Sequence, residues 1–244
     1  MPGAEFDNPT RPVSWQPILM TRVRHRLLLG LAFAGTAAGA LFAQPPADSG
    51  TILVSLIDRP IGKETFELRA DGQGWRFTAD LNLLERGGAL QFSAALQLDA
   101  DLSPRRLTAK GRTYRFVNSD VSVEIAEGTA RDDQFGETTT GPLPRTFFAA
   151  LSYAPLASRA LLIRYWEKHG RPARLTVVPG PPARTVGIEA RGTDSVRVGG
   201  RDVRLRRFTV HGVVWGREAV WLDGRGRCAA IVSRIHILPL EAVR

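Results

Sequence analysis

The stretch WRFTADLNLLERGGALQFSAALQL, residues 75–98, decides the fold class of this chain of 244 residues. Apolar and polar side chains alternate on either side of the glycine pair at positions 87 and 88. Alternation with a period of two predicts two long antiparallel strands, each with one buried and one solvated face, joined by a turn. The buried face would hold Trp75, Phe77, Ala79, Leu81, Leu83, Leu90, Phe92, Ala94, Leu96 and Leu98.

The same alternation continues through most of the chain from residue 51 and predicts a mainly β fold. We expect a curved antiparallel sheet of about 12 strands, as a half-barrel or an open barrel, covered by one or two helices. The helical segment lies between residues 144 and 170, where Pro155 suits the first helical position and Gly170 suits the C-terminal cap. The polar stretch 127–140 predicts a loop.

Composition restricts the class of protein. Apolar residues make up 43% of the chain and charged residues 23%, which is typical of a folded globular protein. The single cysteine excludes a disulfide scaffold and a zinc site made of several thiolates. The formal net charge is +9, but the basic residues are spread along the strands without stacking aromatics, so we expect no nucleic-acid partner. Attraction to an anionic membrane surface is the alternative use of this charge.

Residues 20–43 have the order of a bacterial secretory signal peptide, with a basic stretch, an apolar run and small side chains at the end. We expect cleavage after Ala43, with Ala40 as a second candidate. The alternative is a membrane anchor, but an apolar run of roughly 15 residues is shorter than a spanning helix requires. The chain is therefore expected to be exported, periplasmic or extracellular, with no transmembrane segment after cleavage.

Domain boundaries follow from this leader. Met20 begins a well-formed basic region, so residues 1–19 are interpreted as a gene-model extension. A short linker is expected over 44–50 and a single β-rich domain over 51–238. Residues 239–244 are expected to be a truncated linker or a tail, because Pro239 is followed mainly by good helix formers.

No recognised constellation of catalytic residues is present in the sequence. It has no His-x-His pair, no Gly-x-Ser-x-Gly elbow and no glycine-rich phosphate loop. We expect the C-terminal carbonyls of a helix to interact with His169, structural roles for His211 and His236, a packed Cys228, and solvated carboxylates at Asp132 and Asp133. The sequence therefore predicts that the chain is not an enzyme and has no catalytic residue, no metal site and no cofactor.

The strongest candidate for a binding site is apolar. Side chains on one face of a curved sheet could enclose an acyl chain or another apolar small molecule. The candidate residues are Trp75, Phe77, Leu81, Phe92, Leu96 and Leu98. The alternative is that the same side chains form an ordinary core beneath the helix.

Four stretches, residues 58–64, 164–170, 220–223 and 240–244, resemble the β-rich region that precedes the catalytic barrel of secreted bacterial amidohydrolases. The metal-binding His-x-His motif of that barrel has no match here, so no catalytic residue is carried over. The resemblance implies an accessory domain, detached from a catalytic amidohydrolase domain or chain that would be its partner.

A second resemblance covers Arg191 to Val210, Trp215-Gly216, Val220-Trp221-Leu222-Asp223 and Gly226. This run is similar to the last strands of periplasmic half-barrel proteins, namely DUF3108-like domains and, more remotely, LolA-type lipoprotein carriers. It implies a free-standing carrier or sensor that binds a lipid or another apolar ligand.

Two functions therefore stay open, an exported non-catalytic accessory or interaction domain and, as the alternative, a periplasmic carrier or sensor for an apolar ligand. A carrier should keep an internal cavity. An interaction domain should have a filled core and an apolar patch on its outer surface.

Overall fold

The alternating residues 75–98 form two paired strands in the computed structural model. β3 (Gly74–Glu85) and β4 (Gly88–Leu98) run antiparallel, and every predicted apolar position of one lies opposite an apolar position of the other. The six candidate ligand-binding residues form three cross-strand pairs, Trp75 with Leu98, Phe77 with Leu96, and Leu81 with Phe92. Direct cross-strand neighbours share one face of a sheet, so the predicted common face is confirmed.

The structure describes residues 47–85, 88–112, 118–134, 136–152, 155–179, 184–214, 216–235 and 238–244. Before the helix, the remaining strands are β1 (Asp48–Leu56), β2 (Arg59–Asp71), β5 (Pro104–Arg112), β6 (Asn118–Ala126), β7 (Thr129–Gln134), β8 (Glu137–Pro142) and β9 (Phe147–Ala149). The helix α1 (Ser158–Lys168) precedes β10 (Leu175–Val178), β11 (Arg184–Val198), β12 (Arg201–His211), β13 (Arg217–Leu222), β14 (Cys228–Ile235) and β15 (Leu238–Val243).

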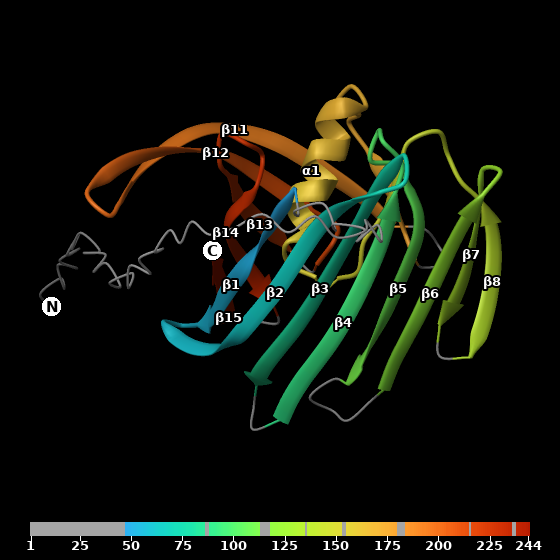
Figure 1. The fold of residues 1–244 in the computed structure, drawn as a ribbon, viewed down its shortest axis with the longest axis horizontal. Helices are drawn as coiled ribbons and strands as arrows, with labels where there is room; N and C mark the ends of the chain where they lie inside the picture. Colours follow the sequence, from blue (N-terminus) through green and yellow to red (C-terminus); the bar gives the residue numbers. More distant parts are fainter. Residues whose placement is uncertain are drawn as a thin grey trace, which may run out of the picture.

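The strands follow one another in a single hydrogen-bonded order, β8-β7-β6-β5-β4-β3-β2-β1-β15-β14-β13-β12-β11-β10-β9. All strand pairings among the described residues are antiparallel except the parallel pair of β9 and β10. The two end strands, β8 and β9, do not pair with each other, so the curved sheet is not closed. β9 instead lies against β5, and β6, β7 and β8 extend past this point (Figure 1). The expected curved open sheet is therefore confirmed, with fifteen strands in the described residues rather than about twelve.

The helix α1 stands between the two halves of the rolled sheet (Figure 1). Only Arg164, Glu167 and Lys168 of its side chains are not buried. Trp166 meets Phe208 of β12 edge to face, while the loop before the helix contacts β2. Since both halves of the sheet pack on it, α1 fills the interior and does more than cover an open face.

The helix begins later than its sequence suggests. Pro155 was expected at its first position, but the helix begins at Ser158 and Pro155 lies in the buried loop before it. The physical reason is a tertiary contact, described below, which holds the two residues after Pro155 against the sheet. Gly170 follows the C-terminal end with a φ of 82°, the left-handed conformation that favours glycine at this position.

The expectation of a loop over 127–140 is wrong. Residues 129–134 and 137–142 form the antiparallel hairpin β7–β8 at one end of the sheet. These strands carry few apolar residues, and Thr138, Thr139 and Thr140 are exposed. The hairpin forms strands because β7 pairs with β6 through backbone hydrogen bonds. Strands at the end of a sheet need little apolar surface, so the usual apolar alternation is absent.

Both expected boundaries of the domain also shift. β1 starts at Asp48, inside the linker expected over 44–50, and residues 238–243 form β15 rather than a linker or tail. β15 lies between β1 and β14. Its pairing with β1 joins the two ends of the described chain, which local sequence cannot reveal. The expected extension over 1–19 and signal peptide over 20–43 lie outside the described residues. The described part of the chain contains no helix long and apolar enough to cross a membrane.

Candidate functional site

A buried carboxylate fastens the start of α1 to the sheet. Glu64, on the inner face of β2, accepts hydrogen bonds from the backbone N–H groups of Leu156 and Ala157 at 2.6 and 2.8 Å. These residues come directly before α1, where backbone N–H groups have no partner within the helix. The negative carboxylate also lies at the positive end of the helix dipole. Glu64 therefore caps the helix from a distant strand.

A buried ion pair holds the first turn of the helix to β13. The Arg159 Nε donates to the Glu218 Oε2 at 2.8 Å, and the two side chains are 0% and 1% exposed. The remaining guanidinium nitrogens of Arg159 donate to the carbonyls of Leu151 and Ser152 at 3.2 and 2.8 Å. The second carboxylate oxygen of Glu218 has no hydrogen-bond partner among the described residues.

Arg184, at the start of β11, completes this cluster. It donates to the carbonyls of Ala150 and Val213, both at 3.0 Å, and to the hydroxyl of Ser152 at 2.5 Å. Burial lowers the pKa of Arg184, and the positive charge of Arg159 lowers it further. We call Glu64, Arg159, Arg184 and Glu218 the buried cluster, which contains two acids and two bases.

Burial also perturbs the acid that caps the helix. Removal from water raises the pKa of Glu64 from 4.5 to about 7, against the opposing effects of the two backbone hydrogen bonds and of the Arg159 charge. Perturbed carboxyl groups often mark functional sites, but structural ion-pair networks shift pKa values too. Glu64, Arg159 and Glu218 are all closed off from solvent. The buried cluster therefore positions α1 and the loop before it.

None of these charged residues was predicted from the sequence, although a signal for two of them is present. Glu64 has the same phase as Phe66 and Leu68, and Glu218 has the same phase as Val220 and Leu222. A charged residue at a core position of an alternating strand implies a buried partner, because an isolated buried charge is too costly. What the pattern could not supply was the partner, Arg159, which lies 59 residues from Glu218.

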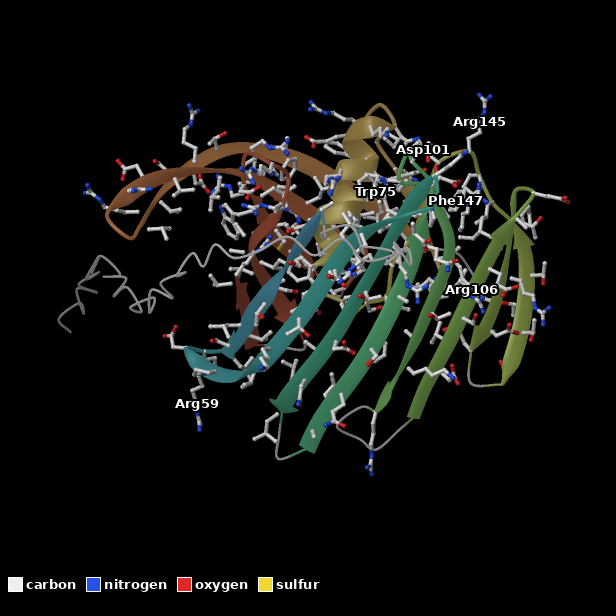
Figure 2. All side chains as sticks on the ribbon, in the orientation of Figure 1. Arg59, Trp75, Asp101, Arg106, Arg145 and Phe147 are labelled. Atoms are coloured by element: carbon white, nitrogen blue, oxygen red, sulfur yellow. The ribbon has the colours of Figure 1, made fainter. Side chains whose placement is uncertain are left out.

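The other end of α1 is tied to the turn between β4 and β5. The Lys168 Nζ donates to the carbonyl of Ala100 at 3.0 Å, and the ring of His169 lies 3.1 Å from the carbonyl oxygen of Asp101. Figure 2 shows Asp101 and Phe147 at the end of the sheet where α1 lies, and the Phe147 N–H is 3.3 Å from the Tyr165 hydroxyl. The expected contact of His169 with the helix carbonyls is corrected, because its side chain reaches across to Asp101.

The six candidate ligand-binding residues face this filled interior. Phe77, Leu81, Leu96 and Leu98 are buried in the core, and Trp75 and Phe92 pack against it while partly exposed. A narrow crevice lies between β3–β5 and the loop before α1, lined by Phe77, Ala94, Leu96, Leu107, Ala150 and Pro155 among others. It is too narrow to admit a water molecule. Only Phe77 and Leu96 of the six candidates line it.

The other residues singled out in the sequence have varied surroundings. Cys228 is buried, as expected, and burial raises the pKa of its thiol to about 12. Asp132 is buried on β7 instead of solvated, and Asp133 accepts from the Thr138 hydroxyl. His211 is exposed at the end of β12, and His236 lies outside the described residues. Within residues 47–85 and the other described ranges, no group of three or more His, Cys, Asp or Glu side chains could hold a metal ion.

Apolar side chains on the outer face of the sheet form a second candidate site. The register aligns Leu53, Val243, Ala230 and Trp221 across β1, β15, β14 and β13, and we call these four residues the outer row. Leu53 is 55% exposed and Val243 is 41% exposed. The Trp221 indole N–H donates to the Asp194 carboxylate at 2.7 Å, which fixes the ring. Lys63 and Arg207 continue the row at its two ends.

No family model matches this sequence, and no curated protein matches it. Among solved structures, the chain is similar to the crystal structure of a beta-barrel-like protein of domain of unknown function DUF1849 from Brucella abortus. The two share 14% sequence identity with a TM-score of 0.49, over 80% of this chain and 94% of the other. The comparisons give no support to a link with amidohydrolases, and the fold class rests on the strands described above.

Proposed function

We propose that this chain is an exported, non-catalytic binding module that recognises a protein partner through the outer row. The single observation that carries this proposal is the alignment of exposed apolar side chains on the outer face, over a core that is already filled. Leu53 and Val243 lie directly opposite each other, while Ile52 and Val54, the chain neighbours of Leu53, point into the core. Contiguous exposed apolar surface of this kind typically marks an interaction site.

The chemistry of the outer row suits a protein interface. A tryptophan held by a hydrogen bond is a common anchor residue in such interfaces, because it buries a large area at little cost in conformational entropy. The row ends in the exposed Lys63 on one side and in Arg207 on the other, and Arg207 is 3.3 Å from Asp194. We therefore expect a partner with an apolar centre and an acidic group facing Lys63.

The first partner to test is an amidohydrolase. Two of the stretches that resemble the regions preceding amidohydrolase barrels, 220–223 and 240–244, contain Trp221 and Val243 of the outer row. A catalytic chain of that class, encoded near this one, would be purified and titrated against this protein by isothermal calorimetry. Leu53→Asp and Val243→Asp should each weaken binding at least tenfold, because a carboxylate would be buried without a partner.

Leu84→Asp is the matched control, since Leu84 is an exposed apolar residue on β3 outside the outer row. It should leave the affinity unchanged. Photo-crosslinking from p-benzoyl-L-phenylalanine in place of Leu53, in the native host, would identify any other partner. If the crosslinked partner is another protein and the crosslink disappears in Val243→Asp, the outer row is supported as the binding site. The amidohydrolase is then excluded as the partner. Identical crosslinks from positions 53 and 84 would refute the proposal.

A second candidate function, a carrier for an apolar ligand, rests on the crevice beside α1. Its lining is apolar and includes Phe77 and Leu96. A ligand could enter only if the loop before α1 moved away, which would break the contacts of Glu64 and Arg159. Mass spectrometry of lipid extracts from the purified protein tests this function. A stoichiometric lipid, lost in Leu96→Trp, would favour the carrier over the binding module.

A further inference from the structure

The hairpin of β11 and β12 extends beyond the rest of the sheet. We call residues 191–206 the arm. From Arg191 to Arg204, side chains on both faces of this two-stranded ribbon are mostly exposed, whereas earlier residues of β11, such as Val186, are buried. Figure 1 shows the arm as an isolated orange hairpin that reaches out past the other strands. At about 3.3 Å per residue, the tip lies roughly 20 Å from the base of the arm.

Two features of the backbone shape the arm, a register shift at its base and a glycine turn at its tip. The register between β11 and β12 shifts between Ala190 and Thr193, where Gly192 has a φ of 90°. Such a bulge bends a strand pair and increases its twist. At the tip, Gly199 and Gly200 both have positive φ, as a tight two-residue hairpin turn requires. The arm is therefore a defined ribbon that leaves the body at a set position.

The tip combines exposed apolar side chains with cations. Val196 lies opposite Val203, and Val198, which is 61% exposed, lies opposite Arg201. Residues 195–204 contain three arginines and one aspartate. Arg197 lies 3.7 Å from Asp202, whereas Arg201 and Arg204 have no ion-pair partner among the described residues. The register places Arg201 on the same face of the tip as the valines and Arg204 on the opposite face, so a tip that docks end on presents apolar side chains together with uncompensated positive charge.

We propose that the arm docks on the surface of an anionic lipid bilayer, with its valines in the headgroup region and Arg201 and Arg204 against lipid phosphates. Charge complementarity favours this occupant, because arginines near an anionic bilayer gain about a fivefold factor in binding each. The small apolar tip suits shallow insertion and lacks the aromatic anchor that a protein interface typically requires. The arm meets the outer row at its base, where Asp194 accepts from Trp221, but its tip, residues 195–204, lies apart from that row. The inference does not rest on the proposed function.

Vesicle sedimentation tests this inference on the protein as purified from its host, so that every variant shares the same N-terminus. The probes are large unilamellar vesicles of phosphatidylcholine, with or without one-third phosphatidylglycerol. We expect binding to the anionic vesicles that weakens at high salt, since ionic screening shortens electrostatic attraction. The double variant Arg201→Gln with Arg204→Gln should lose about 25-fold in partitioning, from two fivefold factors. Val198→Ser should also weaken binding.

Matched controls separate the arm from general charge and apolarity. Arg76→Gln and Leu84→Ser remove an exposed arginine and an exposed leucine on β3, and both should bind the anionic vesicles like the unaltered protein. All of these positions are exposed, so circular dichroism should show the same folded state for each variant. Absence of binding to anionic vesicles would overturn the inference. Equal losses of vesicle binding in the control and arm variants would also overturn it. So would an arm that binds an acidic protein but not the vesicles.

Discussion

Replacing Arg159 by methionine should destabilise the fold more than any surface charge substitution in this chain. The substitution keeps most of the aliphatic volume but removes the guanidinium, which donates to Glu218, Leu151 and Ser152. The carboxylate of Glu218 would then remain in a position that is almost fully buried, with Oε2 deprived of its donor and Oε1 already without one among the described residues. Removing one partner of a buried ion pair costs about 3–5 kcal/mol in the free energy of unfolding.

The double variant Arg159→Met with Glu218→Leu separates the ion pair from the packing around it. Both charges are then absent, so most of the loss should be recovered, leaving a cost of about 1–2 kcal/mol from the two carbonyls that lose a donor. The coupling between the two positions should therefore be several kcal/mol, far above that of independent sites. Arg105→Met is the control, because it breaks an exposed ion pair with Asp99 and should cost less than about 1 kcal/mol.

Urea unfolding at pH 7.5, followed by tryptophan fluorescence, measures these differences, and Trp166 on α1 reports on the helix directly. A cost of less than about 1 kcal/mol for Arg159→Met would refute a stabilising role of the ion pair, as would a double variant as unstable as the sum of the two single variants. Either result would mean that the buried cluster does not hold α1 in the rolled sheet.

Three further predictions concern the inner face. Folding raises the pKa of Glu64 from 4.5 to about 7, so the protonated group contributes to stability below pH 4.5, and this contribution of at most about 3 kcal/mol is lost as the pH rises to about 7. In Glu64→Gln, the urea midpoint should no longer fall between pH 4.5 and 7.5 for this reason. An unchanged fall would assign it to another group. Phe77→Ala should cost about 3–5 kcal/mol in urea unfolding and Trp75→Ala less, because Phe77 is fully buried and Trp75 only partly, and the reverse order would contradict the described packing. The buried Cys228 thiol, with its raised pKa, should not react with a thiol reagent such as Ellman's in the native protein but should react once in urea, so rapid native labelling would disprove its burial.

Local periodicity predicted much of the inner face. Phe77 and Leu96, and Leu81 and Phe92, are direct cross-strand neighbours, as alternation about a short turn requires. The helix was predicted in the correct segment because Gly170, which suits the C-terminal end of a helix, is a local signal. The start of α1 was misplaced because Glu64, about 90 residues earlier, binds the N–H groups of Leu156 and Ala157.

Local alternation is enough to predict the β class and the burial of Cys228, because each depends on neighbours in the chain. It also predicts the common face of Trp75, Phe77, Leu81, Phe92, Leu96 and Leu98. Contacts between distant parts of the chain are needed to pair β15 with β1, to place α1 in the interior, and to leave the outer row and the arm in solvent. The reason is that hydrophobic burial is non-directional. Alternation shows which side chains avoid water, while pairings between distant strands decide what covers them.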